Sequence, residues 1–280
     1  MKKLLLIFSV YSATFFIGVA FVIFLHFVKT KNIVETPKQA DPKAELAKPS
    51  KEIVAAPKIF AVKNFWDEFE NQENKHLIEP GEVNQKDIKI KSGKSWLGLF
   101  GDADNSYLRQ TKVLINQTDK SKLNWGEITI EGKETPFFLV KGLKKVKAGK
   151  ITSLFFDKNK YEESGSQSTS IEKDFNKSFK LGEQSYTLRV EEGLSEDQEP
   201  ILVLLLESET ESQIIHYSYD GNDVGNLYWV GDLDSDGKLD LFMDFWNYEK
   251  GYYSSGLFLS SEAKKGQLVK RFKFLAFGGC

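Results

Sequence analysis

The sequence predicts an all-β domain, a sandwich or barrel-like fold, preceded by one N-terminal transmembrane helix and a flexible, disordered linker. Three observations support this prediction. Residues 4–28 contain no Asp, Glu, Lys or Arg, and residues 29–57 hold four of the chain's seven prolines. From residue 58 onward, short apolar and β-branched segments recur with turn residues between them, which is typical of β-sandwiches and barrels. The chain also contains 22 Phe and 10 Tyr, residues that favour strands.

Residues 1–28 are predicted to be a transmembrane signal-anchor. A helix over the uncharged stretch would be about 37 Å long, more than the roughly 30 Å hydrocarbon core of a bilayer. Lys2 and Lys3 precede this stretch and are expected to stay in the cytoplasm, which would place the rest of the chain outside. A cleaved signal peptide is the alternative. Its apolar region is usually about 7–15 residues long and ends at a small-x-small site, whereas this segment is longer and lacks that site.

Residues 29–57 are predicted to be a flexible linker. Lys, Ala, Glu and Pro dominate this segment, and no apolar period is sustained. Such a composition favours a solvated, semi-extended chain over a packed element. The linker is therefore expected to hold the folded region away from the membrane.

Residues 58–280 are predicted to form one β-rich domain. Residues 65–70 could form a short helix or an irregular segment, and the remaining apolar runs favour strands. The predicted strands are residues 87–91, 108–115, 125–130, 137–140, 151–156, 186–190, 201–206, 214–219, 227–230, 239–245, 256–259 and 268–274.

Two segments of this domain carry more specific expectations. Residues 201–206 are apolar at every position, which indicates a central strand covered on both faces. Residues 157–176 are rich in Ser, Glu, Lys and Asn, which predicts a long exposed loop. That loop could divide the domain into two β lobes or project from a single one.

The most informative motif is a predicted calcium loop over residues 232–240. Its carboxylates occupy loop positions one, three, five and nine, namely Asp232, Asp234, Asp236 and Asp240. Gly237 at position six permits the sharp turn, and the carbonyl of Lys238 at position seven can supply a further oxygen. Calcium takes six to eight oxygen ligands, and alternate residues of a tight loop point inward toward one ion. We therefore expect Ca²⁺ as the cofactor of this loop.

The loop differs from an EF-hand, because its twelfth position is Met243 instead of the bidentate Glu and its flanks favour strands. It resembles the Asp-x-Asp-x-Asp-Gly-x-x-Asp loop of integrin-α-type FG-GAP repeats. This resemblance covers residues 228–244 and implies a calcium site in a β-hairpin, with the four aspartates as side-chain ligands and Lys238 as a carbonyl ligand. The motif occurs once, so it does not imply a propeller. The C-terminal stretch from Trp229 through residues 257–269 to Cys280 also looks like uncharacterised bacterial envelope proteins.

Other acidic and basic groups give weaker expectations. Asp244 lies beyond the loop pattern and is expected to face solvent. Residues 101–105 repeat the start of the loop without acids at positions five and nine, so a polar turn is expected there. His76 and His216 are the only histidines outside residues 4–28, and neither belongs to a catalytic triad or zinc motif. His216 is expected to be a packed or surface residue.

Composition and motifs together favour a binding role over catalysis. The net charge is −2 with no basic face, so nucleic acid is not expected as a partner. A single cysteine excludes an intramolecular disulfide. The leading hypothesis is a membrane-anchored, extracytoplasmic module, periplasmic or on the cell surface, that binds another envelope protein or a polysaccharide. The alternatives are an envelope polysaccharide hydrolase using two carboxylates, and a scaffold subunit of a membrane complex.

Overall fold

The computed structural model describes residues 57–62, 75–84, 92–117, 125–157, 169–219, 223–247, 252–272 and 276–278. All of them belong to one compact unit, Ala55–Cys280. Within these residues the chain forms strands and one turn of 3-10 helix, η2 (Ser260–Glu262), so the predicted all-β class is confirmed. The predicted anchor and almost all of the predicted linker lie outside the described residues, as do the segments 65–70 and 87–91. Among the described residues, no helix has the length and apolar character needed to cross a membrane.

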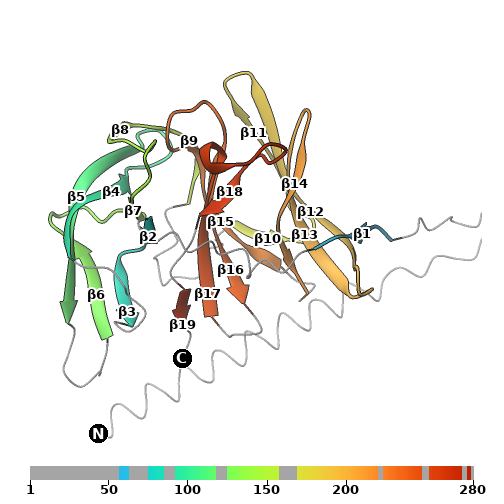
Figure 1. Cartoon of the computed structure of the whole chain (residues 1–280), viewed down its shortest axis with the longest axis horizontal. Helices are drawn as coiled ribbons and strands as arrows, with labels where there is room; N and C mark the ends of the chain where they lie inside the picture. The colour runs from blue at the N-terminus through green and yellow to red at the C-terminus, as the bar shows by residue number, and fades with distance from the viewer. Residues whose placement is uncertain are drawn as a thin grey trace, which may run out of the picture. The chain divides into compact units, whose positions relative to one another are not determined.

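Three sheets build this unit (Figure 1). Sheet I has the order β2-β7-β4-β5-β6-β3, with β8 beside β5. Its strands are β2 (His76–Ile78), β3 (Gly81–Asn84), β4 (Gly93–Phe100), β5 (Tyr107–Gln117), β6 (Trp125–Ile130), β7 (Leu139–Lys141) and β8 (Gly149–Lys150). Sheet II has the order β10-β15-β16-β17-β18, with β9 beside β15 and β19 beside β17. Its strands are β9 (Thr152–Phe156), β10 (Thr169–Glu172), β15 (Asp223–Asp232), β16 (Asp240–Asn247), β17 (Tyr252–Leu259), β18 (Lys270–Phe272) and β19 (Ala276–Gly278).

Sheet III has the order β1-β12-β13-β14, with β11 beside β12. Its strands are β1 (Ile59–Phe60), β11 (Asn176–Leu181), β12 (Gln184–Ser195), β13 (Pro200–Ser208) and β14 (Ser212–Ser218). Among the described pairings, β1 with β12 is parallel and the others are antiparallel. The predicted strands at residues 108–115, 125–130 and 201–206 are confirmed as parts of β5, β6 and β13.

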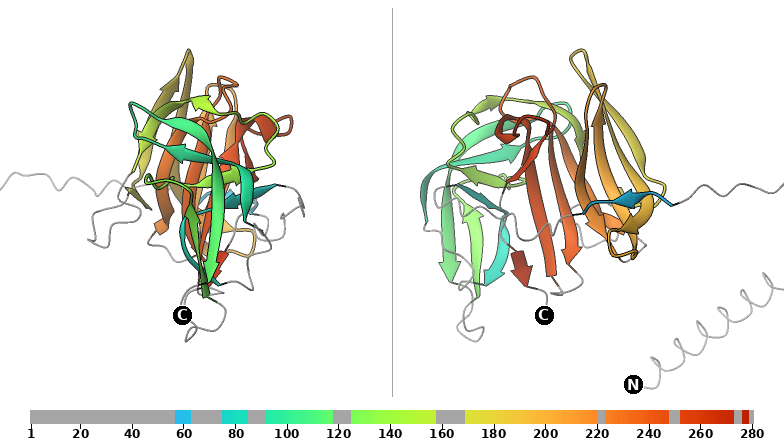
Figure 2. Two further views of the ribbon diagram at one scale, coloured as in Figure 1. Left: turned by 90° about the vertical axis from the view of Figure 1, so that its left-hand side faces the viewer. Right: turned by 45° about the vertical axis from the view of Figure 1, so that its right-hand side comes forward.

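Sheet II lies between the other two sheets (Figures 1 and 2). Side chains alternate between the two faces of a strand, and β16 shows this directly. Met243 belongs to the core shared with sheet III, while Phe242 belongs to the core shared with sheet I. Sheet I is curled. Residues of five of its strands, including Trp96 and Val113, meet inside the curl and form a further hydrophobic cluster. Sheet II is therefore buried on both faces, which holds its β15–β16 hairpin firmly.

Strand β13 confirms the prediction of a strand covered on both faces. All six residues from Ile201 to Leu206 are at most 4% exposed. Leu204 and its neighbours at alternate positions face sheet II, whereas Val203 and its neighbours join Phe60 on the opposite face. Burying an aliphatic side chain of this kind contributes about 1.5–3 kcal/mol.

The predicted loop over residues 157–176 is partly wrong. Strand β10 lies within that range and pairs with β15. Ile171 of β10 is fully buried in the core between sheets II and III, and Asp157 is 7% exposed. The pairing with β15 and the one buried side chain hold this short strand, and a single isoleucine leaves no periodic signal in the sequence.

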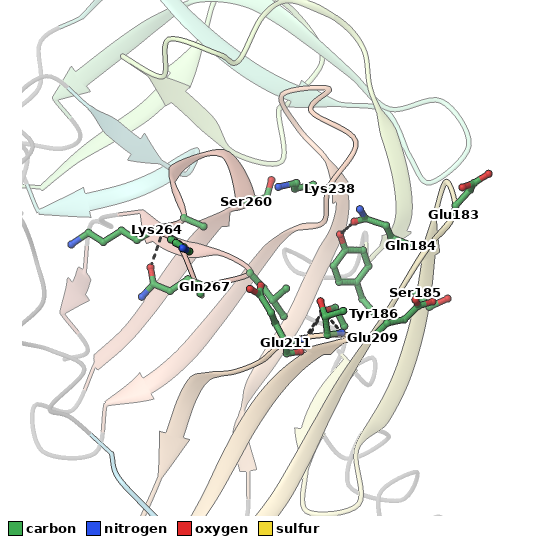
Figure 3. A pocket seen from close by; sticks show the side chains of 16 residues that line it. Glu183, Gln184, Ser185, Tyr186, Glu209, Glu211, Lys238, Ser260, Lys264 and Gln267 are labelled. Carbon is green, nitrogen blue, oxygen red and sulfur yellow. Dashed lines mark hydrogen bonds between the residues drawn. The ribbon is translucent and has the colours of Figure 1, made fainter.

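A polar cleft opens at one edge of the unit (Figure 3). It lies where the tips of the β11–β12 and β13–β14 hairpins meet the β15–β16 loop and the segment that follows η2. Its volume is about 720 Å³. The fold thus brings the predicted calcium loop next to a cavity formed by two sheets.

Candidate metal site

The predicted calcium loop connects two antiparallel strands of sheet II. Asp232 is the last residue of β15 and Asp240 is the first residue of β16, and Gly231 pairs with Asp240 in the ladder. The prediction that strands flank the loop is confirmed, and this separates it from the helix-flanked EF-hand. Gly231 also permits a close approach, because a Cβ there would lie 2.2 Å from the carbonyl oxygen of Thr152 in β9.

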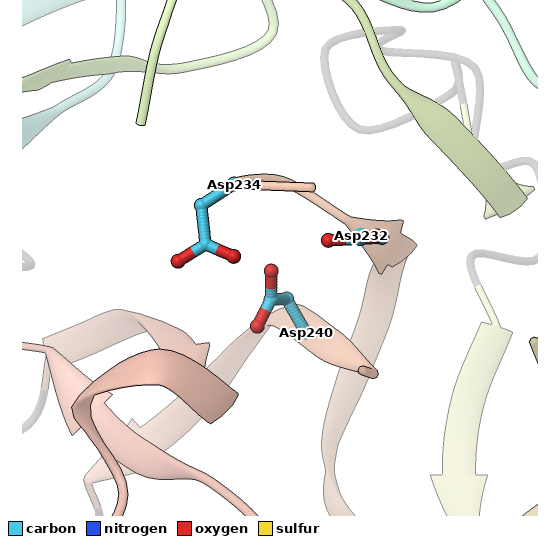
Figure 4. A group of neighbouring side chains, drawn as sticks. All are labelled: Asp232, Asp234 and Asp240. Carbon is cyan, nitrogen blue, oxygen red and sulfur yellow. The ribbon is translucent and has the colours of Figure 1, made fainter. Parts of the chain in front are cut away.

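Three carboxylates converge in the loop (Figure 4). Asp232, Asp234 and Asp240 each offer an oxygen within 4.8 Å of the other two. Two oxygens bound to opposite sides of a calcium ion at about 2.4 Å would lie about 4.8 Å apart, so this spacing suits a single ion. Asp232 is 8% exposed and Asp240 is fully buried, so such an ion would be largely removed from water.

Hydrogen bonds from backbone amides to the Asp232 carboxylate fix the first half of the loop. The carboxylate of Asp232 accepts the amide of Asp236 at 3.0 Å and the amide of Gly237 at 2.9 Å. Ser235 and Gly237 adopt φ angles of 60° and 80°, in the left-handed region that glycine adopts most readily. No atom lies within 4 Å of a Cβ built on Gly237. Glycine is therefore needed at loop position six for its backbone conformation, not for space.

Asp240 is the most enclosed of the acids. Its Oδ2 accepts the Leu233 amide at 2.8 Å, and its Oδ1 accepts the Ser260 amide at 2.8 Å and the Ser260 hydroxyl at 3.0 Å. Burial raises the pKa of Asp240 to about 8, and the nearby charge of Asp234 adds to this effect. The hydrogen bonds from Ser260 and Leu233 act in the opposite direction. Without a cation, the charged form of this carboxyl group is thus disfavoured.

Asp234 provides the clearest test of whether the loop suits a metal ion. Both of its carboxylate oxygens are shielded from solvent, and neither has a well-formed hydrogen bond to any described residue. Burial raises the pKa of Asp234, helped by the charges of Asp236 and Asp232, while Ser261 and Lys145 lower it. The Ser261 hydroxyl thus lies close enough to influence the charge without forming a regular bond. A carboxylate whose oxygens are shielded from water without regular hydrogen bonds is costly, and a cation would offset that cost.

The other two predicted ligands are placed differently. Asp236 is exposed and is not among the three converging acids. Its carboxylate accepts the Lys238 amide at 2.9 Å and lies 3.1 Å from the Ser260 hydroxyl through each of its oxygens. Lys238 is exposed, and its side chain lines the cleft. Asp236 therefore caps the loop from outside in this arrangement.

Ser260 is a site residue that the sequence motif did not reveal. It comes twenty positions after Asp240, directly after β17, yet its hydroxyl lies within hydrogen-bond distance of both Asp236 and Asp240. Its single hydroxyl proton can serve only one of these acids at a time. The spacing of the loop contains no signal for this contact, because the contact depends on the register of β16 with β17.

The expectation that Asp244 faces solvent is wrong. It is 7% exposed, and it accepts the Tyr228 hydroxyl at 2.8 Å and the Asn226 side-chain amide at 2.9 Å. Burial, and then the neighbouring Asp244 charge, raises the pKa of Tyr228. Asp244 is an even-numbered residue of β16, like Asp240 and Phe242, and the strand alternation turns all three toward the same face.

Two weaker expectations are confirmed. Residues 101–105 form a polar turn in which the Asp102 carboxylate accepts the amides of Asp104 and Asn105 at 3.2 Å and 3.1 Å. His216 is packed in the interior, 4% exposed, with its ring centroid 4.1 Å from that of Phe245. Neither feature belongs to the metal site.

Comparison of the chain with known protein families, with curated proteins and with solved structures gives no match. The class of site is therefore defined by the geometry alone, as a β-hairpin loop with three converging carboxylates.

Proposed function

We propose that the β15–β16 loop binds one calcium ion. The observation that carries this proposal is Asp234, whose two buried oxygens lack regular hydrogen bonds beside two further carboxylates. Asp232, Asp234 and Asp240 would hold the ion. The resemblance to FG-GAP loops adds Asp236 and the Lys238 carbonyl to this set, and Asp236 would have to turn inward from its contact with Ser260 to reach the ion. An all-oxygen set in a loop suits calcium, because magnesium demands smaller, near-octahedral geometry.

The proposed role of the ion is structural. Two strands of sheet II and the segment beginning at Ser260 meet at the loop through hydrogen bonds to Asp240. An ion that neutralises the acids would stabilise this junction and hold one wall of the cleft in place. Extracellular calcium modules commonly bind with dissociation constants of about 10⁻⁴–10⁻³ M, which is the range proposed for this loop.

On this basis we propose that the chain is a calcium-stabilised binding module of the cell envelope. The support comes from the sequence: the apolar segment at residues 4–28, the linker that follows it and the β-rich domain. The domain would then lie outside the cytoplasm on a single-pass anchor and bind another envelope protein or a polysaccharide. A scaffold role in a membrane complex would differ by stable co-purification of other membrane proteins.

Hydrolysis is the less favoured alternative. A glycosidase pairs two carboxyl groups across the scissile bond, and its general acid usually sits in apolar surroundings. The cleft contains the carboxyl groups of Glu183, Glu209 and Glu211, and all three are exposed. The cleft therefore offers the polar surroundings of a binding surface.

A melting experiment tests the calcium proposal. The melting temperature of the full-length chain in detergent would be measured in chelator, in millimolar calcium and in millimolar magnesium. We expect calcium at 1 mM to raise the melting temperature by about 1–5 °C, since a ligand at about 1–10 times its Kd stabilises the folded state by about 0.4–1.4 kcal/mol. Magnesium should give a clearly smaller rise. Equal melting temperatures in all three conditions would overturn the proposal.

A further inference from the structure

The cleft beside the calcium loop has two walls of opposite charge. The wall built from the hairpin tips of sheet III carries Glu183, Glu209 and Glu211, which we call the acidic wall. The wall built from the β15–β16 loop and the segment after η2 carries three lysines, which we call the basic wall: Lys238, Lys264 and Lys265. Figure 3 shows the two walls coming from separate strands and loops around one opening.

The two walls do not neutralise each other. All six charged residues are exposed, and within the described part of the chain no ion pair shorter than 4.0 Å joins a glutamate of one wall to a lysine of the other. Opposite charges carried on the two sides of one opening, without an ion pair across it, create a field across the opening. Such a field favours a ligand with separated positive and negative ends.

The rest of the lining is polar. The same hairpin tips and segments also contribute hydroxyl and amide groups to the lining, among them Ser185, Ser208, Ser260 and Gln267. Among the described residues of the lining, Tyr186 is the only aromatic one; it is 4% exposed and donates its hydroxyl to Gln184. An apolar ligand would find little surface here, and a sugar ring would find no exposed aromatic face on which to stack.

The size of the cleft suits a small ligand or a short chain segment. Its volume of about 720 Å³ falls within the roughly 300–1,000 Å³ typical of ligand pockets. A few amino-acid residues in extended form would fit a cavity of this volume, and their backbone N–H and C=O groups match the hydroxyl and amide lining.

From these observations we propose that the cleft binds a short dipolar peptide, with its ammonium groups against the acidic wall and its carboxylates against the basic wall. Charge-assisted hydrogen bonds at both ends would fix the direction of the peptide. The proposal deepens the binding role proposed above by naming the class of partner. It does not require the calcium ion, although two residues are shared: Ser260 contacts the acids of the metal loop, and Lys238 is part of that loop.

The test uses the full-length chain in detergent and the pentapeptide Lys-Gly-Ser-Gly-Glu with free termini. This peptide has positive charge at one end, negative charge at the other and no net charge. Its neutral control is acetyl-Gln-Gly-Ser-Gly-Gln-amide, and a neutral hexasaccharide is the third probe. Titration calorimetry would be run in chelator and in calcium, at low and at high salt.

The dipolar peptide is expected to bind with a Kd of about 1 mM or lower, and the binding should weaken at high salt. The double variant Glu209→Gln, Glu211→Gln should weaken it at least about fivefold, or about 1 kcal/mol. The double variant Lys264→Gln, Lys265→Gln should have a similar effect. Glu196→Gln, an exposed acid outside the cleft lining, is the matched control and should change nothing.

The proposal is overturned if the dipolar peptide fails to bind, if the neutral peptide binds equally well, or if the hexasaccharide alone binds. Peptide binding in chelator together with an unchanged melting curve in calcium would refute the calcium site and leave the cleft proposal standing. A rise in melting temperature with calcium, together with no peptide binding, would refute the cleft proposal and leave the calcium site standing. Melting curves of the wall variants check that they fold. They should match the curve of the natural chain, because exposed substitutions usually change stability by less than about 0.5 kcal/mol.

Discussion

Ser260 donates two hydrogen bonds to one oxygen of Asp240, from its backbone amide at 2.8 Å and from its hydroxyl at 3.0 Å. Both residues are at most 6% exposed. This contact joins the first residue of β16 to the first residue of η2, directly after β17, and it connects the metal loop to the lining of the cleft. The hydroxyl also lies 3.1 Å from both oxygens of Asp236, so one side chain connects two acids of the loop.

We expect Ser260→Ala to lower the free energy of unfolding by about 1–2 kcal/mol, because a buried acceptor loses one of its donors. The backbone amide still serves Asp240, which limits the loss. Ser178→Ala is the matched control, since this hydroxyl is exposed and pairs with Thr187. Denaturant unfolding in chelator measures both variants, and equal stabilities would contradict the role given to Ser260.

Asp234→Asn should act in opposite directions with and without calcium. In chelator the neutral amide avoids the cost of a buried charge, so the melting temperature should stay the same or rise. In calcium most of the stabilisation should disappear, because a carboxylate ligand is lost. Asp197→Asn, an exposed acid away from the loop, should keep the full calcium effect. If Asp234→Asn also keeps the full calcium effect, Asp234 is not a ligand of the ion.

His216 should make stability depend on pH. Burial, and then the charge of Arg271, holds the pKa of His216 well below 6.5 in the folded chain. Below about pH 6.5 the unfolded chain binds a proton at this residue that the folded chain does not bind, so the contribution of His216 to the free energy of unfolding falls as the pH falls. The contribution approaches about 1.4 kcal/mol per pH unit.

The matched variant for this prediction is His216→Gln, which cannot titrate. Melting curves between pH 7 and pH 5 should show a shallower loss of stability for the variant than for the natural chain. If the melting temperatures of the variant and the natural chain change equally with pH, His216 does not cause the loss of stability at low pH.

The sequence was sufficient to predict the structure of segments that carry a strong local pattern. Six consecutive apolar residues from Ile201 identified a strand buried on both faces, and strand-forming residues on either side of the loop excluded an EF-hand. Strand β10 was not predicted, because its polar segment contains only one inward-facing apolar residue, Ile171. The contact between Ser260 and Asp240 was not predicted either, because a strand register relates residues that no local spacing connects.

Asp244 shows a signal that was present and could have been used. If Asp240 points into the loop, then the alternation along β16 turns Phe242 and Asp244 to the same side. The flanking apolar residues place that side in the interior. The polar partners of Asp244, Tyr228 and Asn226, lie on the neighbouring strand, so only the fold could reveal them.

The central claim is that one calcium ion binds at Asp232, Asp234 and Asp240. Isothermal titration of calcium into the chelator-treated, full-length chain tests it most directly, with Asp234→Asn titrated alongside. We expect one ion per chain with a Kd of about 10⁻⁴–10⁻³ M, and clearly weaker binding by the variant. An absence of binding, or equal affinity and stoichiometry for the variant, would contradict it.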